Sequence, residues 1–428
     1  MQGEEMSNRS TSEVEHELPK LKSSRQQQLN AAPRINAAPR VNPASPVQKN
    51  KNDVETDRWQ SWLRQICDEC GVTINGSEPP DPQIHNTDVA KRMITDGSIG
   101  LGEAYMEGWW DCEALDELAT AMLKVKIASK MEVENKTRLL YEIAKVRIFN
   151  FQKKSRAFQV GEQHYDTGND LFEVMLDPTM SYSCGYWKGA SNLHEAQINK
   201  LDLLCRKLQL EKGMTLLDIG SGWGGLAEHA ARNYGVEVVG VTVSKEQAAL
   251  AEERCRGLPI EFRLQDYRDL TGTFDRIVSV GMFEHVGLKN YGTYMQKCHS
   301  LLRAEGLFVL HTIGTNRTHN LVDPWIKKYI FPNGKLPSLN QITSAYEPYF
   351  VLEDLQNFGP DYDKTLMQWS ANFRDGWDQL SGQYSDQFYR MWQYYLNISA
   401  GTFRCRDNQL WQMVFSKPVD SKRYDSPR

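Results

Sequence analysis

A glycine-rich loop that directly follows an apolar strand constrains the fold of this chain more than any other feature. Residues 217–225 read Leu-Asp-Ile-Gly-Ser-Gly-Trp-Gly-Gly, and an apolar run that begins at Met214 leads into them. Glycine takes positive φ at little cost and lets the backbone approach a ligand closely. In open α/β sheets, ligands bind outside the carboxyl ends of the strands. We therefore expect a ligand site where this strand ends.

The segment after about residue 200 alternates expected strands with expected helices. Strands are expected over residues 214–220, 236–243, 260–264, 275–280 and 307–313, and helices over 226–234, 246–256 and 291–302. This alternation is typical of a doubly wound, Rossmann-like α/β fold with a mostly parallel sheet. Two late apolar runs, 350–355 and 410–415, would complete a sheet of seven strands, and the aromatic segment between them is expected to be helical.

The glycines alone fit two kinds of nucleotide site. Gly220-x-Gly222-x-x-Gly225 matches the dinucleotide fingerprint of a nicotinamide oxidoreductase. However, the second expected strand ends in Val-Thr-Val-Ser at 241–244, without the acidic residue that holds an NAD ribose. Asp218, two residues before the first glycine, can instead reach a cationic amino acid group. This arrangement resembles the signature of S-adenosylmethionine-dependent methyltransferases.

Composition excludes several other classes of protein. Fifty Lys and Arg against 55 Asp and Glu give a net charge of −5, which excludes a uniformly basic nucleic-acid binder. Eight cysteines in 428 residues are too few for a disulfide scaffold, and Cys67-Asp-Glu-Cys70 lacks the second pair that zinc would need. No stretch approaches the roughly 20 apolar residues of a membrane span, and the N-terminus lacks a signal-peptide pattern. We expect a cytoplasmic protein, peripherally associated with a membrane, without a metal.

The chain divides into four expected segments. Residues 1–55 are polar and proline-containing, which is typical of a disordered tail. A small, mostly helical domain over 56–150, a catalytic domain over 151–418 and a C-terminal tail over 419–428 follow. Within 124–158, ten Lys and Arg against three Glu give a local charge of +7. Each basic side chain near an anionic lipid surface contributes about 1 kcal/mol, so the N-terminal domain is expected to dock on a membrane, deliver lipid or form a homodimer. A solvated helix face with a linker is the alternative.

Motifs along most of the chain resemble those of bacterial cyclopropane-fatty-acyl-phospholipid synthases. Besides the glycine loop, they are Tyr182-Ser-Cys-Gly-Tyr-Trp, Gln265-Asp-Tyr-Arg-Asp, Gly281-Met-Phe-Glu-His-Val-Gly, Leu310-His-Thr-Ile-Gly, Asp323-Pro-Trp-Ile-x-Lys-Tyr-Ile-Phe-Pro-Asn-Gly and Phe358-Gly-x-Asp-Tyr-Asp. The resemblance implies a class I methyltransferase fold. It also implies transfer of a methylene group from S-adenosylmethionine to the cis double bond of an unsaturated phospholipid acyl chain. In that reaction, bound bicarbonate deprotonates a carbocation.

The resemblance also assigns roles to single residues. Cys184, Glu284, His311 and Tyr362 would be catalytic and, with the backbone of Ile313, would bind bicarbonate. The S-adenosylmethionine site would comprise Tyr182, Ser183, Asp218, Gly220, Ser221, Gly222, Trp223, Gly224, Thr242, Ser244, Gln247, Tyr267 and Arg268, with Gln265 and Asp266 beside the adenine. Without the resemblance, Cys184 could be a packed thiol and His311 a core histidine. The expected place of His311 at the end of its strand favours a function.

One position departs from the family pattern. Some relatives carry a cysteine in an Asn-x-Cys-Ala-Gly segment, whereas this chain has Ser399 there. A serine without a nearby base is not an activated nucleophile, and methyl transfer to an alkene needs no covalent enzyme intermediate, so we expect a structural role. The alternatives to cyclopropanation are methylation without ring closure, small-molecule N-methylation and a catalytically silent lipid-binding module.

Overall fold

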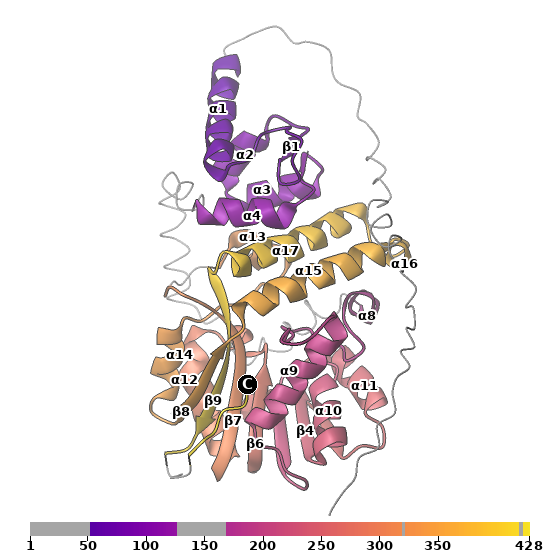
Figure 1. The fold of residues 1–428 in the computed structure, drawn as a ribbon, viewed down its shortest axis with the longest axis vertical. Coiled ribbons are helices and arrows are strands. Elements are labelled where there is room, and N and C mark those ends of the chain that lie inside the picture. Colours follow the sequence, from indigo (N-terminus) through magenta and orange to yellow (C-terminus); the bar gives the residue numbers. More distant parts are fainter. Residues whose placement is uncertain (1–51, 126–167, 319–321, 419–422) are drawn as a thin grey trace, which may run out of the picture. The chain divides into compact units, whose positions relative to one another are not determined.

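A seven-stranded sheet forms the centre of the computed structural model, which describes residues 52–125, 168–318, 322–418 and 423–428 (Figure 1). In spatial order, its strands are β5 (Ile260–Leu264), β4 (Glu237–Thr242), β3 (Thr215–Ile219), β6 (Phe274–Val280), β7 (Leu302–Thr315), β9 (Asn408–Ser416) and β8 (Val351–Asn357). Strand β9 is antiparallel to both of its neighbours, β7 and β8, and the other neighbouring strands of this sheet are parallel to one another. The expected doubly wound, mostly parallel sheet is confirmed, and the two late strands complete it.

Helices cover both faces of the sheet (Figure 1). Helices α9 (Leu193–Lys207) and α10 (Gly225–Tyr234) pack on one face, and α12 (Tyr291–Leu301) and α14 (Leu339–Tyr346) pack on the other. Helix α11 (Lys245–Arg254) contacts β4 and β5. Residues of α8 (Asn169–Met175), α13 (Pro324–Tyr329), α15 (Gly359–Asp375), α16 (Trp377–Leu380) and α17 (Asp386–Arg404) belong to another apolar cluster, and the 3₁₀ turns are η3 (Tyr267–Asp269), η4 (Phe283–His285) and η5 (Leu288–Asn290). Leu216 packs in the cluster with α9 and α10, whereas its neighbour Leu217 packs in the cluster with α12. Strands buried on both faces read as continuous apolar runs, which is why the sequence reveals them.

Strand β7 is longer than the sequence predicts. It pairs with β9 from Leu307 to Thr315 and with β6 from Leu302 onward. His311 therefore lies four residues before the end of β7, but it pairs with Val280, the last residue of β6, and so lies level with the carboxyl end of that neighbouring parallel strand. Strand β7 continues past residue 313 because it pairs there with β9, a distant segment that leaves no signal in the local sequence.

The N-terminal described segment is mostly helical, as expected. It contains α1 (Asn52–Cys70), β1 (Gln83–Ile84), α2 (Val89–Asp96), α3 (Ser98–Met106), β2 (Trp110–Asp111) and α4 (Leu115–Lys124). Helix α1 begins at Asn52, so it includes the last four residues of the expected tail at 1–55. Leu115 and Leu118 of α4 pack in one apolar cluster with residues of α15 and α17, and from Asn52 onward the described residues belong to one compact unit.

Two expected features lie outside the described residues. Most of the basic segment at 124–158, together with the expected domain boundary at 151, falls in the stretch 126–167. Nearly all of the expected tail, residues 1–51, is likewise outside. Part of the expected C-terminal tail is packed: the Tyr424 hydroxyl donates a hydrogen bond to the Lys207 carbonyl at 2.9 Å. Among the helices described, none is both long and apolar enough to cross a membrane.

Candidate active site

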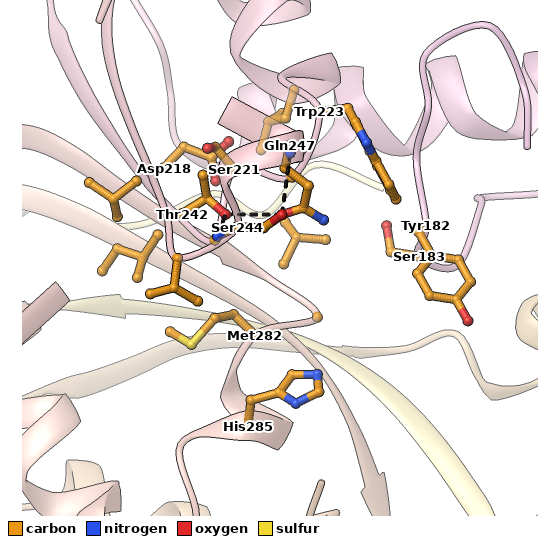
Figure 2. A pocket seen from close by; sticks show the side chains of 18 of the residues that line it. Tyr182, Ser183, Asp218, Ser221, Trp223, Thr242, Ser244, Gln247, Met282 and His285 are labelled. Atoms are coloured by element: carbon orange, nitrogen blue, oxygen red, sulfur yellow. Dashed lines mark hydrogen bonds between the residues drawn. The ribbon is translucent and has the colours of Figure 1, made fainter. Parts of the chain in front are cut away.

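A cavity of about 210 Å³ lies at the carboxyl ends of β3, β4 and β6 (Figure 2). All of the expected cofactor residues except Gly224 line it, and so do Gln265 and Asp266. Gly224 instead lies against β5: a Cβ added to it would be 2.9 Å from the ring of Phe262. The cavity stands where parallel α/β sheets bind their ligands.

The glycine loop is held against the end of β4. The backbone N–H groups of Gly220 and Ser221 both donate to the Val241 carbonyl, at 2.9 and 3.0 Å. Gly220 and Gly222 have φ values of +89° and +53°, a region that other residues enter only with strain. A Cβ added at Gly222 would meet no atom within 4 Å, so the backbone there is open to a ligand.

A hydrogen-bond network after β4 fixes one polar wall of the cavity. Thr242 Oγ1 donates to Gln247 Oε1 at 2.9 Å, and the Ser244 hydroxyl caps α11 by accepting from the Gln247 backbone N–H at 3.3 Å. Figure 2 shows these three side chains together, across the cavity from Tyr182 and Ser183. The network places an uncharged amide near the strand end where NAD enzymes carry an acid.

Asp218 and Lys200 put opposite charges on the walls of the cavity. Asp218 is 2% exposed, and burial raises its pKa to about 7. Lys200 is also 2% exposed; burial lowers its pKa to about 8, and its Nζ donates to Ser183 Oγ at 3.0 Å. Lys200 was not among the predicted site residues. The signal was present: Gln197 and Lys200 are polar at positions of α9 whose neighbours, such as Leu201, face the core.

His285 is a second cavity residue that the sequence analysis did not assign. It lies on η4 directly after Glu284, and Figure 2 shows it on the same side of the cavity as Met282. Burial lowers the pKa of its imidazole to about 4, so the ring is neutral near pH 7. Its place within the motif at 281–287 was the available signal.

Glu284 and Ile313 come together as predicted. The Ile313 backbone N–H donates to Glu284 Oε1 at 2.6 Å. Glu284 is 6% exposed, and burial raises its pKa to about 7 despite this hydrogen bond. A carboxyl group with a pKa near 7 can gain or lose a proton at neutral pH, which suits acid–base chemistry.

His311 lies deeper in the sheet, 1% exposed. Its Nδ1 is 3.2 Å from the amide nitrogen of Gln412 on β9, so Nδ1 accepts and Nε2 carries the proton. Burial, reinforced by the charges of Lys200 and Lys207, lowers the pKa of His311 well below its usual range and keeps it neutral. Among the described residues, neither His311 Nε2 nor Glu284 Oε2 has a hydrogen-bond partner, and both are buried. Orphaned polar atoms of this kind suit a small polar ligand such as bicarbonate.

Cys184 and Tyr362 gather at helix α15. Burial, with the nearby charge of Asp361, raises the pKa of the Cys184 thiol, so it remains protonated. The residue after it, Gly185, donates its N–H to Thr365 Oγ1 at 3.1 Å. Tyr362 packs on Phe403 with ring centroids 4.6 Å apart. None of the five predicted bicarbonate residues lines the cavity itself.

Aromatic side chains connect the cavity to this second group of residues. Tyr182 lines the cavity, and its ring lies 5.1 Å from that of Trp369, which lies 5.9 Å from that of Tyr362. The hydroxyls of Tyr182 and Tyr395 are 2.8 Å apart. The half-buried ring of Tyr182 and the buried ring of Trp369 therefore connect the cavity to Tyr362.

Comparisons with known proteins agree with this arrangement. The family model described as mycolic acid cyclopropane synthetase matches residues 152–413. The chain is 54% identical over 368 residues to the cyclopropane-fatty-acyl-phospholipid synthase of Escherichia coli (strain K12), covering 86% of this chain and 96% of that protein. The cyclopropane synthase MmaA2 of Mycobacterium tuberculosis is 32% identical with a TM-score of 0.58, covering 61% of this chain and 98% of that one. Mycolic acid cyclopropane synthase CmaA1, solved with SAH and CTAB, is 35% identical with a TM-score of 0.57 and the same coverage.

Proposed function

Since the chain belongs to the mycolic acid cyclopropane synthetase family of S-adenosylmethionine-dependent methyltransferases, we propose that it transfers a methylene group to the cis double bond of unsaturated phospholipid acyl chains. One observation carries the proposal beyond the family: a charged cavity of nucleoside size lies beside two groups of buried polar residues. Glu284, paired with Ile313, directly precedes the cavity residue His285, and Tyr362 is connected to the cavity through the rings of Trp369 and Tyr182. The cavity suits a cationic donor, and the carboxyl group of Glu284 suits proton transfer.

Bound S-adenosylmethionine supplies an electrophilic methyl group. Asp218 would hold its cationic amino group, and Gln247, fixed by Thr242, would bond its ribose hydroxyls. An alkene is a weak nucleophile, so most of the acceleration must come from holding the reacting atoms in near-attack geometry. The backbone bonds that anchor the glycine loop to β4 provide this rigidity.

Methyl transfer to the alkene leaves a carbocation on the acyl chain, and the site must protect it. Water would capture the cation, so burial of the surrounding rings matters. Tyr182 and Trp369 present aromatic faces between the two subsites, and each such face can stabilise a nearby cation by about 0.5–2 kcal/mol. The rings thus exclude water and stabilise charge at the same position.

Ring closure requires loss of a proton from the transferred methyl group. Bicarbonate, when bound, supplies the base. The groups that we propose to hold it are Glu284 Oε2 and the Nε2–H of His311, which are buried and have no hydrogen-bond partner among the described residues. Tyr362 and the Cys184 thiol, which donates to the Gly185 carbonyl at 3.1 Å, complete the proposed set. Because His311 is uncharged, its Nε2–H can donate to an anion without adding net charge, and the protonated Cys184 thiol could do the same only by leaving the Gly185 carbonyl.

A lipid substrate places the reaction at a membrane surface. We therefore also propose peripheral membrane association, through the basic segment at 124–158, and a homodimer remains an expectation of the N-terminal domain. The local charge of +7 in that segment supports the proposed membrane association.

The direct test is incubation of the full chain with S-adenosylmethionine and vesicles of a cis-unsaturated phospholipid. Mass analysis of the acyl chains should show a gain of one CH₂. Because a methylene branch has the same mass as a ring, proton NMR must show the upfield signals of a cyclopropane. Hydroxylated or methylene-branched chains without ring signals would favour methylation without ring closure. Unchanged lipid, with S-adenosylmethionine bound, would favour small-molecule N-methylation or a silent lipid-binding module.

A further inference from the structure

Lys200 is a buried cation whose charge the fold does not neutralise. Lys200 lines the cavity and is 2% exposed, and its ammonium donates one hydrogen bond, to the uncharged Ser183 hydroxyl at 3.0 Å. An ammonium group has three donors, and no carboxylate among the described residues lies within ion-pair distance of this one. Burying a charge without a partner is costly, so a buried cation of this kind indicates an anionic ligand.

Lys207, seven residues further along α9, shows what the fold does where a lysine is structural. It is fully buried, and its Nζ lies 3.2 Å from Asp354 Oδ2. Two carboxylates, Asp177 and Asp218, interact electrostatically with Lys200 without forming an ion pair with it. Asp177 accepts hydrogen bonds from Thr179 and pairs with His194 at 2.9 Å, and Asp218 lines the cavity itself. The contrast between two lysines on one helix argues that the missing partner of Lys200 comes from outside the chain.

We infer that Lys200 binds the carboxylate of the methionyl part of S-adenosylmethionine while Asp218 takes its ammonium group. The amino acid end of this cosubstrate is a zwitterion, and the cavity offers one buried group of each sign. The Ser183 hydroxyl, held by Lys200, adds a further donor beside the same carboxylate. This inference rests on the proposed cofactor site and assigns the residue that recognises its anionic end.

Bicarbonate is the other anion that the same ammonium could hold. The charge of Lys200 affects the pKa values of Cys184 and His311, so Lys200 lies near the proposed bicarbonate site as well as the cofactor cavity. The two possible anions must therefore be distinguished. The position of the lysine favours the methionyl carboxylate, because Lys200 lines the cavity whereas Cys184 and His311 do not.

The test compares S-adenosylmethionine with its decarboxylated form, which keeps the sulfonium and the amine but lacks the carboxylate. Calorimetric titration of the full wild-type chain should show weaker binding of the decarboxylated form. Lys200→Met, which keeps the side-chain length, should weaken S-adenosylmethionine roughly 10- to 100-fold, the loss expected for a charge-assisted hydrogen bond. The same variant should change the affinity for the decarboxylated form by less than about threefold.

Controls separate binding from folding. Lys207→Met removes another buried lysine of α9 and should leave the ratio of the two affinities as in wild type, measured below its melting temperature. Equal wild-type affinities for the two forms, a comparison that needs no variant, would overturn the inference. So would a Lys200→Met variant that weakens both forms equally, or one that keeps its S-adenosylmethionine affinity but needs more bicarbonate for turnover. If wild type bound neither form, the cofactor site itself would be wrong.

Discussion

The backbone N–H of Ile313 donates a 2.6 Å hydrogen bond to the Glu284 carboxylate, and this bond joins the turn after β6 to the last part of β7. One carboxylate oxygen is thereby fixed by the main chain. The other, Oε2, is buried and has no hydrogen-bond partner among the described residues. A fixed carboxyl group with one available oxygen is prepared to orient a ligand that exchanges protons.

Glu284→Gln tests that role. Glutamine keeps the shape and can still accept from Ile313, but it cannot carry charge or take a proton. We expect turnover to fall about 100- to 10,000-fold, the usual range for a lost acid–base group, with S-adenosylmethionine affinity within about threefold of wild type. Single-turnover rates and calorimetry measure the two effects. Glu261→Gln, at an exposed position of β5, is the matched control, and near-normal turnover in Glu284→Gln would remove Glu284 from the catalytic set.

The raised pKa of Glu284 predicts a pH dependence of stability. Between the ordinary glutamate pKa of 4.5 and the pKa of about 7 in the folded protein, the folded state binds a proton that the unfolded state has lost. The free energy of unfolding therefore falls as pH rises through this window. The free energy of unfolding of Glu284→Gln does not contain this decrease. The difference between the variant and wild type should therefore rise by up to about 3 kcal/mol, in favour of the variant, between pH 4.5 and pH 7.5. Urea denaturation at both pH values measures this, and a constant difference between the two proteins would contradict it.

Local patterns account for the sheet and the cofactor loop but not for long-range pairing. The strand β3 and its glycine loop are specified by neighbouring residues, so the sequence located them. The depth of His311 depends on pairing with β9, from which no local signal arises. Polar residues at core-facing positions of α9 were a signal for Lys200, but its burial depends on contacts with the segment at 181–183, which lies apart from α9 in the sequence.

Arg404 links the N-terminal helices to the catalytic part of the chain. From α17 it bonds Asp116 on α4 and, through two nitrogens, Asp363 on α15. Arg404→Met leaves Asp116, which is 8% exposed, without this partner, and we expect a loss of about 1–3 kcal/mol in the free energy of unfolding. Denaturant titration measures the loss. Arg374→Met removes a pair with the exposed Asp375 and should cost less than about 1 kcal/mol, so equal losses in the two variants would contradict the link.

The basic segment at 124–158 provides the last prediction, although most of it lies outside the described residues. If its charge of +7 attracts anionic headgroups, reversal of four lysines to glutamate should weaken vesicle binding by roughly 1,000-fold, at about 1 kcal/mol for each lysine lost. The four are Lys126, Lys130, Lys153 and Lys154. S-adenosylmethionine affinity should stay unchanged, because the cavity residues are untouched.

A matched control separates a local surface from overall charge. It reverses four lysines at exposed positions elsewhere, so that net charge changes by the same amount: Lys91, Lys188, Lys212 and Lys245. Sedimentation with phosphatidylglycerol-containing vesicles, at low and at high salt, measures binding of both variants and of wild type. Docking by this segment requires that only the first variant lose binding and that salt weaken the wild type, because added ions screen the headgroup charge. Equal loss in both variants would show that binding follows net charge, and retention by the first variant would assign membrane contact to another part of the chain.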